Sequence, residues 1–220
     1  MELNIHTLVI DPEREASRTA EFIRDRVKSS YRRTGTAVGL SGGIDSAVVA
    51  GLCRRAMGSQ VLAAILPCHS LPEDMDFGRQ VAEAFDLETI TIDLSPTYDA
   101  LVAALQALLA GSEPELVMWG FVLRFLDAHG VGPAMDQGVG GGCELLGDAC
   151  FATPLGGCVC RSCGADGGLT VSPATRAALG TLGSMPPDRL ERLKLSPTIA
   201  CQVRDLLRRH IRYHMGVELK

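Results

Sequence analysis

Lysine is nearly absent from this chain of 220 residues, which has it only at Lys28, Lys194 and Lys220. No apolar run reaches the roughly 18 residues that a membrane-spanning helix needs, and the first residues lack the basic and then apolar pattern of a secretory signal. The net charge is −5 and comes entirely from residues 1–110, which contain 10 basic and 15 acidic residues. The sequence has no basic stripe of the kind that indicates a nucleic-acid partner. The composition predicts a soluble cytoplasmic protein that has neither a membrane nor a nucleic acid as partner.

Cysteine is the residue that the second half has in excess. The chain has eight cysteines, five of them within Cys143–Cys163, and in a cytosolic protein they indicate reduced thiols or metal ligands rather than disulfides. Four thiolates are what a structural Zn²⁺ needs, and the chain offers them at Cys150, Cys158, Cys160 and Cys163. Their spacing is irregular, because a single residue separates Cys158 from Cys160. Free thiols in a loose loop are therefore the default interpretation, and a zinc site is the alternative.

One turn carries the strongest chemical signal. A strand-like run over 36–40 breaks at Ser41-Gly42-Gly43-Ile44-Asp45-Ser46, and an apolar helical stretch follows. Glycines let the backbone approach an anion closely, and the helix start offers unpaired N–H groups and the positive end of its dipole. The Asp45 carboxylate would repel bare phosphates, but it could bind a Mg²⁺ ion that lies between it and them. The turn is neither a Walker A loop nor G-x-G-x-x-G. We interpret it as a phosphate-binding loop; a plain glycine-rich turn is the alternative.

The pattern of the first half predicts an α/β fold. Helical periodicity is present over 11–33, 73–85 and 98–109, and strand-like runs lie at 36–40, 61–66 and 89–94. Strands separated by helices are typical of a doubly wound, Rossmann-like parallel sheet, in which ligands bind at the carboxyl ends of the strands. Beyond residue 110 the periodicity fades, because 17 of the 24 glycines lie there. It returns strongly at 198–215, which we expect to be an amphipathic helix.

The sequence resembles the PP-loop (N-type ATP pyrophosphatase) superfamily, and within it the ammonia-dependent NAD synthetase family. Residues 38–50, VGLSGGIDSAVVA, are similar to that family's loop, and 66–74, LPCHSLPED, and 92–96, IDLSP, are similar to the blocks after it. The resemblance covers residues 1 to about 110.

The resemblance implies a ligase that uses ATP and Mg²⁺ to adenylate deamido-NAD⁺ and then amidates it with ammonia, releasing AMP and pyrophosphate. It implies a homodimer. The implied ATP-binding residues are Gly39, Leu40, Ser41, Gly42, Gly43, Ile44, Asp45 and Ser46. Asp45 would hold Mg²⁺, or would only stabilise the first turn of its helix, and Glu144 would be a further Mg²⁺ ligand. His69 and Asp93 are candidates for ligand contacts or for ordinary turn residues.

The second half departs from this family, since its G-T-G-N-x-x-E segment and terminal His-Lys pair are missing. We expect one NAD synthetase-like domain over 1–220, with an ATP-binding part at 1–110 and an irregular, diverged or disrupted part at 111–220. Two alternatives stay open. One is another PP-loop enzyme with a four-cysteine zinc cluster that acts on a nucleobase or tRNA, and the other is a nucleotide-binding protein without catalysis.

Overall fold

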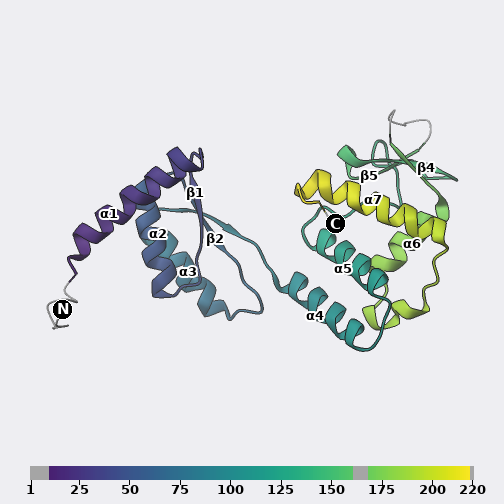
Figure 1. Ribbon diagram of the computed structural model, residues 1–220, viewed down its shortest axis with the longest axis horizontal. Helices are drawn as coiled ribbons and strands as arrows, with labels where there is room; N and C mark the ends of the chain where they lie inside the picture. Colours follow the sequence, from purple (N-terminus) through teal and green to yellow (C-terminus); the bar gives the residue numbers. More distant parts are fainter. Residues whose placement is uncertain (1–9, 161–167, 219–220) are drawn as a thin grey trace, which may run out of the picture. The chain divides into compact units, whose positions relative to one another are not determined.

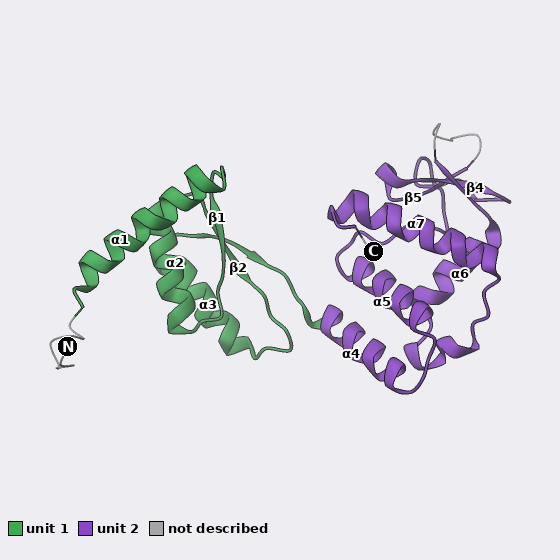
Figure 2. Cartoon of the chain, viewed as in Figure 1, with its two compact units in different colours: residues 1–95 green, residues 96–220 purple. Residues whose placement is uncertain are grey.

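The chain forms two compact units, residues 1–95 and 96–220 (Figures 1 and 2). The computed structural model describes residues 10–160 and 168–218. Each unit has a hydrophobic core of its own: one core draws its buried residues from positions 20–82, and the other from positions 104–211. Separate cores are the physical reason why the chain divides here.

The first unit alternates helices and strands as predicted. Its elements are α1 (Pro12–Asp25), the π-helical turn η2 (Arg26–Ser30), β1 (Thr36–Gly39), α2 (Ile44–Met57), β2 (Val61–Ile65), α3 (Pro72–Ala84) and β3 (Glu88–Thr91). The strands form a parallel sheet in the order β1-β2-β3. The predicted α/β class with a parallel sheet is confirmed, and the predicted elements are present within a few residues of their expected bounds.

The helices of the first unit pack on one face of this sheet. Side chains alternate between the two faces of a strand, and in β2 the residues at alternate positions, Val61, Ala63 and Ile65, are buried, whereas Leu62 and Ala64 between them are half-buried. The buried set shares its core with residues from all three helices: Ala20 of α1, Ala50, Cys53, Ala56 and Met57 of α2, and Ala82 of α3. Burying this apolar surface contributes roughly 25 cal/mol per Å² to stability. The sheet and helices thereby fix the turn that joins β1 to α2.

The second unit is folded where its composition suggests irregular structure. Its elements are α4 (Ser95–Leu109, assigned to this unit from Pro96), α5 (Pro114–Ala128), β4 (Ala149–Ala152), the short 3-10 turn η3 (Thr153–Leu155), β5 (Gly157–Val159), β6 (Leu169–Val171), α6 (Pro173–Ser184), the 3-10 turn η4 (Pro187–Arg192) and α7 (Pro197–Met215). The strands form an antiparallel sheet in the order β5-β4-β6.

The core of this unit lies among α5, α6, α7 and the small sheet. Leu126, Leu182, Leu206 and Leu207 are fully buried in it, as is Phe151 of β4. The amphipathic helix predicted at 198–215 is confirmed as α7. Among the described residues, no helix has the length and apolarity that crossing a membrane requires.

Candidate functional site

The turn between β1 and α2 can be formed only with glycine at Gly42. Its φ is +80°, a left-handed conformation that side chains rarely adopt. A Cβ added there would lie 2.6 Å from the Cβ of Phe77 and 3.1 Å from the carbonyl oxygen of Asp74. Helix α3 therefore supports the turn from one side, and a side chain at this position would collide with that helix.

Two serine hydroxyls close the turn on itself. The Ser46 hydroxyl donates to the carbonyl oxygen of Gly43 at 2.9 Å and accepts from the backbone N–H of Ser41 at 3.3 Å. The Ser41 hydroxyl lies 3.1 Å from the Ser46 hydroxyl and accepts from the backbone N–H of Gly43 at 3.3 Å. These bonds hold both hydroxyls at the end of β1, where they can turn to a ligand.

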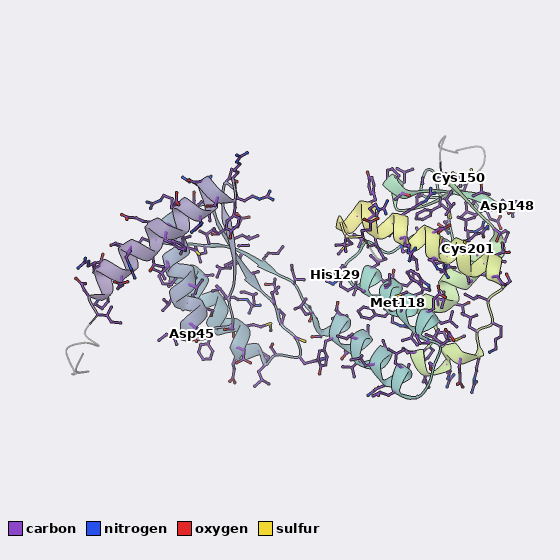
Figure 3. The ribbon with its side chains drawn as sticks, in the orientation of Figure 1. Asp45, Met118, His129, Asp148, Cys150 and Cys201 are labelled. Carbon is purple, nitrogen blue, oxygen red and sulfur yellow. The ribbon has the colours of Figure 1, made fainter. Side chains whose placement is uncertain are left out.

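The start of α2 is open to an anion. Gly43 is the N-cap residue, and no side chain caps the helix there, so the first N–H groups are not satisfied by a capping side chain. Asp45 lies in the first turn, exposed (Figure 3). Within the described ranges its carboxylate has no hydrogen bond or ion pair. Since an exposed carboxylate without a cationic partner beside unpaired N–H groups provides the oxygen ligand that Mg²⁺ prefers, the residues fit a magnesium–phosphate group.

The remaining residues of the predicted loop lie at its two ends. Leu40 is buried and its backbone N–H donates to the carbonyl oxygen of Ala64 at 2.8 Å, which anchors the start of the turn to β2. Gly39 is exposed at the end of β1, and Ile44 exposes 79% of its surface at the start of α2. The eight residues 39–46 therefore run from the last residue of β1, through the turn, to the first turn of α2, at the carboxyl end of a parallel strand.

A cavity of about 360 Å³ opens beside Ser41, lined by Leu40, Ser41, Ile65, Leu66, Pro67, Ser70, Asp74 and Met75. It lies where β1 and β2 end and α3 begins. Sequence reasoning did not single out Ser70, Asp74 or Met75. The signal that points to them is the rule that ligands of parallel sheets bind at the carboxyl ends of neighbouring strands.

His69 and Asp93 form part of a hydrogen-bonded corner after β2 and β3. His69 has a φ of +52°, and its backbone N–H donates to the Ser95 hydroxyl at 2.9 Å. The carboxylate of Asp93 accepts the backbone N–H of Ser95 at 2.9 Å. Hydrogen bonds from Ser95 hold the pKa of Asp93 below its usual value. Asp93 thus acts as a turn former, one of the two roles that the sequence leaves open.

The candidate metal residues of the second half lie in the second unit. Glu144 forms an isolated antiparallel bridge with Gln137. Cys150 is on β4 (Figure 3), Cys158 is on β5, and burial raises the pKa of the Cys158 thiol to about 11. Cys163 lies outside the described residues. Within those residues, no group of three or more histidine, cysteine or acidic side chains is arranged to hold a metal ion.

Two families match the chain, in stretches that overlap around the boundary between the units. The NAD synthase family matches residues 15–113, and the family described as Recombination protein O C terminal matches residues 95–220, more than half of the chain. The second match covers the half in which the NAD synthetase segments are missing, so that half resembles a different family.

Individual relatives agree with the first match. The NH(3)-dependent NAD(+) synthetase of Carboxydothermus hydrogenoformans is 33% identical over 155 residues, which cover 61% of this chain and 63% of that protein. The synthetase of the same name from Rhizobium rhizogenes is 41% identical over 101 residues, which cover 45% of this chain and 30% of that protein. The chain thus spans less than two thirds of the length of these relatives. The solved structure of NMN synthetase from Francisella tularensis gives a TM-score of 0.42 at 19% identity, covering 96% of this chain and 98% of that one.

The match that covers most of the chain lies in the second unit, and the match that contains the phosphate loop lies in the first. The chain therefore belongs to the Recombination protein O C-terminal family through residues 95–220 and carries an NAD synthase segment at residues 15–113.

Proposed function

We propose that the first unit binds ATP with Mg²⁺ through residues 39–46 and serves the ATP-dependent amidation of deamido-NAD⁺ with ammonia. The observation that supports this proposal most is the uncapped start of α2. The Ser41 and Ser46 hydroxyls lie beside it, and the turn that leads to it requires glycine at Gly42. The names of the relatives give the reaction: both are NH(3)-dependent NAD(+) synthetases.

In this proposal the triphosphate accepts hydrogen bonds from the first N–H groups of α2 and from the two serine hydroxyls, because a helix start favours an anion. Asp45 would hold Mg²⁺, which neutralises phosphate charge and so makes pyrophosphate a better leaving group. The magnesium part of the proposal rests on Asp45 alone, since Glu144 is in the unit that matches the other family.

The chemistry proceeds in two substitutions. A carboxylate oxygen of deamido-NAD⁺ bonds to the α-phosphorus of ATP, and the bond to the bridging oxygen breaks to release pyrophosphate. Ammonia then attacks the carboxyl carbon, the bond to AMP breaks, and a proton leaves with solvent. The turn contributes by fixing the position of the phosphates and by stabilising the charge that develops on them. The cavity beside Ser41, which is lined by both apolar and polar side chains, offers space for a further part of the nucleotide.

A turnover assay of the whole chain with ATP, Mg²⁺, deamido-NAD⁺ and ammonia tests this proposal. Release of AMP and NAD⁺ in equal amounts would support it. The matched variants are Ser41→Ala and Ser70→Ala: Ser41 lies in the phosphate turn, whereas Ser70 lines the cavity and accepts a hydrogen bond from the backbone N–H of Cys68, so the first should reduce turnover more strongly. Failure of ATP to bind at all would overturn the proposal. Homodimer formation remains a prediction from the resemblance, and a cytoplasmic location remains a prediction from the composition.

A second candidate function is nucleotide binding without amidation, and one observation favours it: the NAD synthase match ends at residue 113. In the same assay this candidate predicts Mg²⁺-dependent ATP binding without release of AMP. The two functions therefore differ in a single measured product.

A further inference from the structure

Among the described residues of the first unit, no helix covers the second face of the sheet. On this face lie Ala37 and Gly39 of β1, Leu62 and Ala64 of β2, and Glu88 and Ile90 of β3, as the register of the strands requires. We call these six residues the bare face; it is apolar apart from Glu88 at the β3 rim. Ala37, Gly39 and Ile90 are exposed, Ile90 by 42%, whereas the opposite face lies against all three helices of the unit.

A parallel sheet with a face in water is unusual, because such sheets occur almost only with both faces covered. The bare face is also open around Gly39, the last residue of β1, because a Cβ added there would meet no atom within 4 Å. Another chain segment could therefore approach the sheet closely at this point.

The edge of the sheet beside β1 is open as well. Over the described residues β1 pairs only with β2. The backbone N–H groups of Thr36 and Leu40 donate toward β2, to the carbonyl oxygens of Gln60 and Ala64. In a parallel ladder alternate residues face the same neighbour, so the N–H groups of Ala37 and Gly39 point to the open side.

The two edges of the sheet differ in the way that distinguishes a protected edge from an unprotected one. Strand β3 carries Glu88, and Asp86 and Asp93 flank it. Charges of this kind prevent an edge strand from pairing with another chain. Strand β1 has no charged residue and no proline. The β1 edge is therefore ready to accept a further strand.

We propose that the bare face and the β1 edge bind a strand-and-helix segment of a second polypeptide, which carries the remaining part of an NAD synthase domain. Its strand would pair in parallel with β1, and its apolar helix would cover the bare face. Doubly wound sheets have strands on both sides of the first strand and helices on both faces. The NAD synthase match stops at residue 113, and the curated relatives are considerably longer than their matched parts.

A second copy of this chain fits the surface less well. Two copies that paired through their β1 edges about a twofold axis would run antiparallel, and both bare faces would stay in water. Two copies stacked through their bare faces would leave both β1 edges unpaired. Only a segment with a strand and a helix can pair with the β1 edge and cover the bare face at the same time.

This inference rests on the proposed function and deepens it. The carboxyl end of a strand parallel to β1 would lie at the same edge of the sheet as Ser41. The partner would thereby bring its own side chains to the phosphate turn and supply site residues that this chain lacks.

The test uses the full chain and a probe made of the part of the Carboxydothermus hydrogenoformans synthetase that lies beyond its counterpart of Glu113. Calorimetry should detect binding of the probe, and hydrogen exchange at the amides of Ala37 and Gly39 should slow by about tenfold or more on binding. Ala37→Lys and Ile90→Lys should each weaken binding about tenfold or more, because each buries a charge in the interface. Tyr31→Lys is the matched control, since Tyr31 is exposed by 69% and follows η2 outside the sheet.

Three outcomes would overturn the inference: no binding of the probe, equal effects of all three variants, or slow exchange at Ala37 and Gly39 in the chain alone, with or without self-association. ATP titration of the chain without the probe separates the two proposals. If ATP binds and the probe does not, this inference fails and the proposed function stands. If the probe binds and ATP does not, the proposed function fails.

Discussion

Replacing Gly42 by alanine tests whether the phosphate turn is as closely packed as the structure shows. Its φ of +80° costs a non-glycine residue about 1–3 kcal/mol. The new methyl group would also lie 2.6 Å from the Cβ of Phe77 and 3.1 Å from the carbonyl oxygen of Asp74, and such crowding costs about 1–3 kcal/mol more. The first unit should therefore lose about 2–6 kcal/mol of stability, a large part of what a domain has.

Gly43→Ala is the matched control. Gly43 has a φ of −78°, and a Cβ there would meet only the Ser41 hydroxyl, at 3.4 Å. The expected loss is about 1 kcal/mol or less, that of an N-cap alanine. Hydrogen exchange at the amides of β1 and β2 measures the first unit. Fluorescence of Trp119, the only tryptophan, reports on the second unit and should not change. Equal stability of the two variants would refute the reasoning.

Three further predictions follow from single contacts. Asp45→Asn should lower the stability of the first unit by no more than about 1 kcal/mol, the size of the interaction between a first-turn carboxylate and its helix, but should remove most of the gain in ATP affinity that Mg²⁺ gives; calorimetry with and without Mg²⁺ would contradict the metal role if the gain persisted. Ser46→Ala should destabilise the first unit by about 1–2 kcal/mol, since its hydroxyl joins Gly43 and Ser41; unchanged hydrogen exchange in β1 would count against this. Burial lowers the pKa of His210 below 6.5, so the unfolded chain takes up this proton first; the second unit should keep its full stability above about pH 6.5 and lose part of it as the pH falls below that value, and urea unfolding followed by Trp119 fluorescence would oppose the idea if it showed no such loss.

The fold of the first unit could be predicted because its local signals agree with one another. Strand β2 is a continuous apolar run, and α3 has an apolar stripe at helical spacing. The glycines and serines of the turn also indicate a phosphate-binding loop by their residue types alone. What the sequence does not reveal is long-range packing: nothing near Gly42 indicates that Phe77 will lie against it.

The second unit was harder to predict because its strands are only three or four residues long, too short for a clear alternation. Helix α6 contains Gly180 and Gly183, which lower helix propensity. Its stability comes from tertiary packing, as the complete burial of Leu182 shows. The division into two compact units could not be predicted for a related reason, since two separate cores cannot be distinguished in a list of apolar residues.

Titration of the whole chain with ATP, in the presence and absence of Mg²⁺, tests the central claim most directly. The account predicts saturable binding that Mg²⁺ strengthens and that Ser41→Ala and Asp45→Asn weaken. ATP affinity that is absent, or that neither Mg²⁺ nor these substitutions alter, would contradict it.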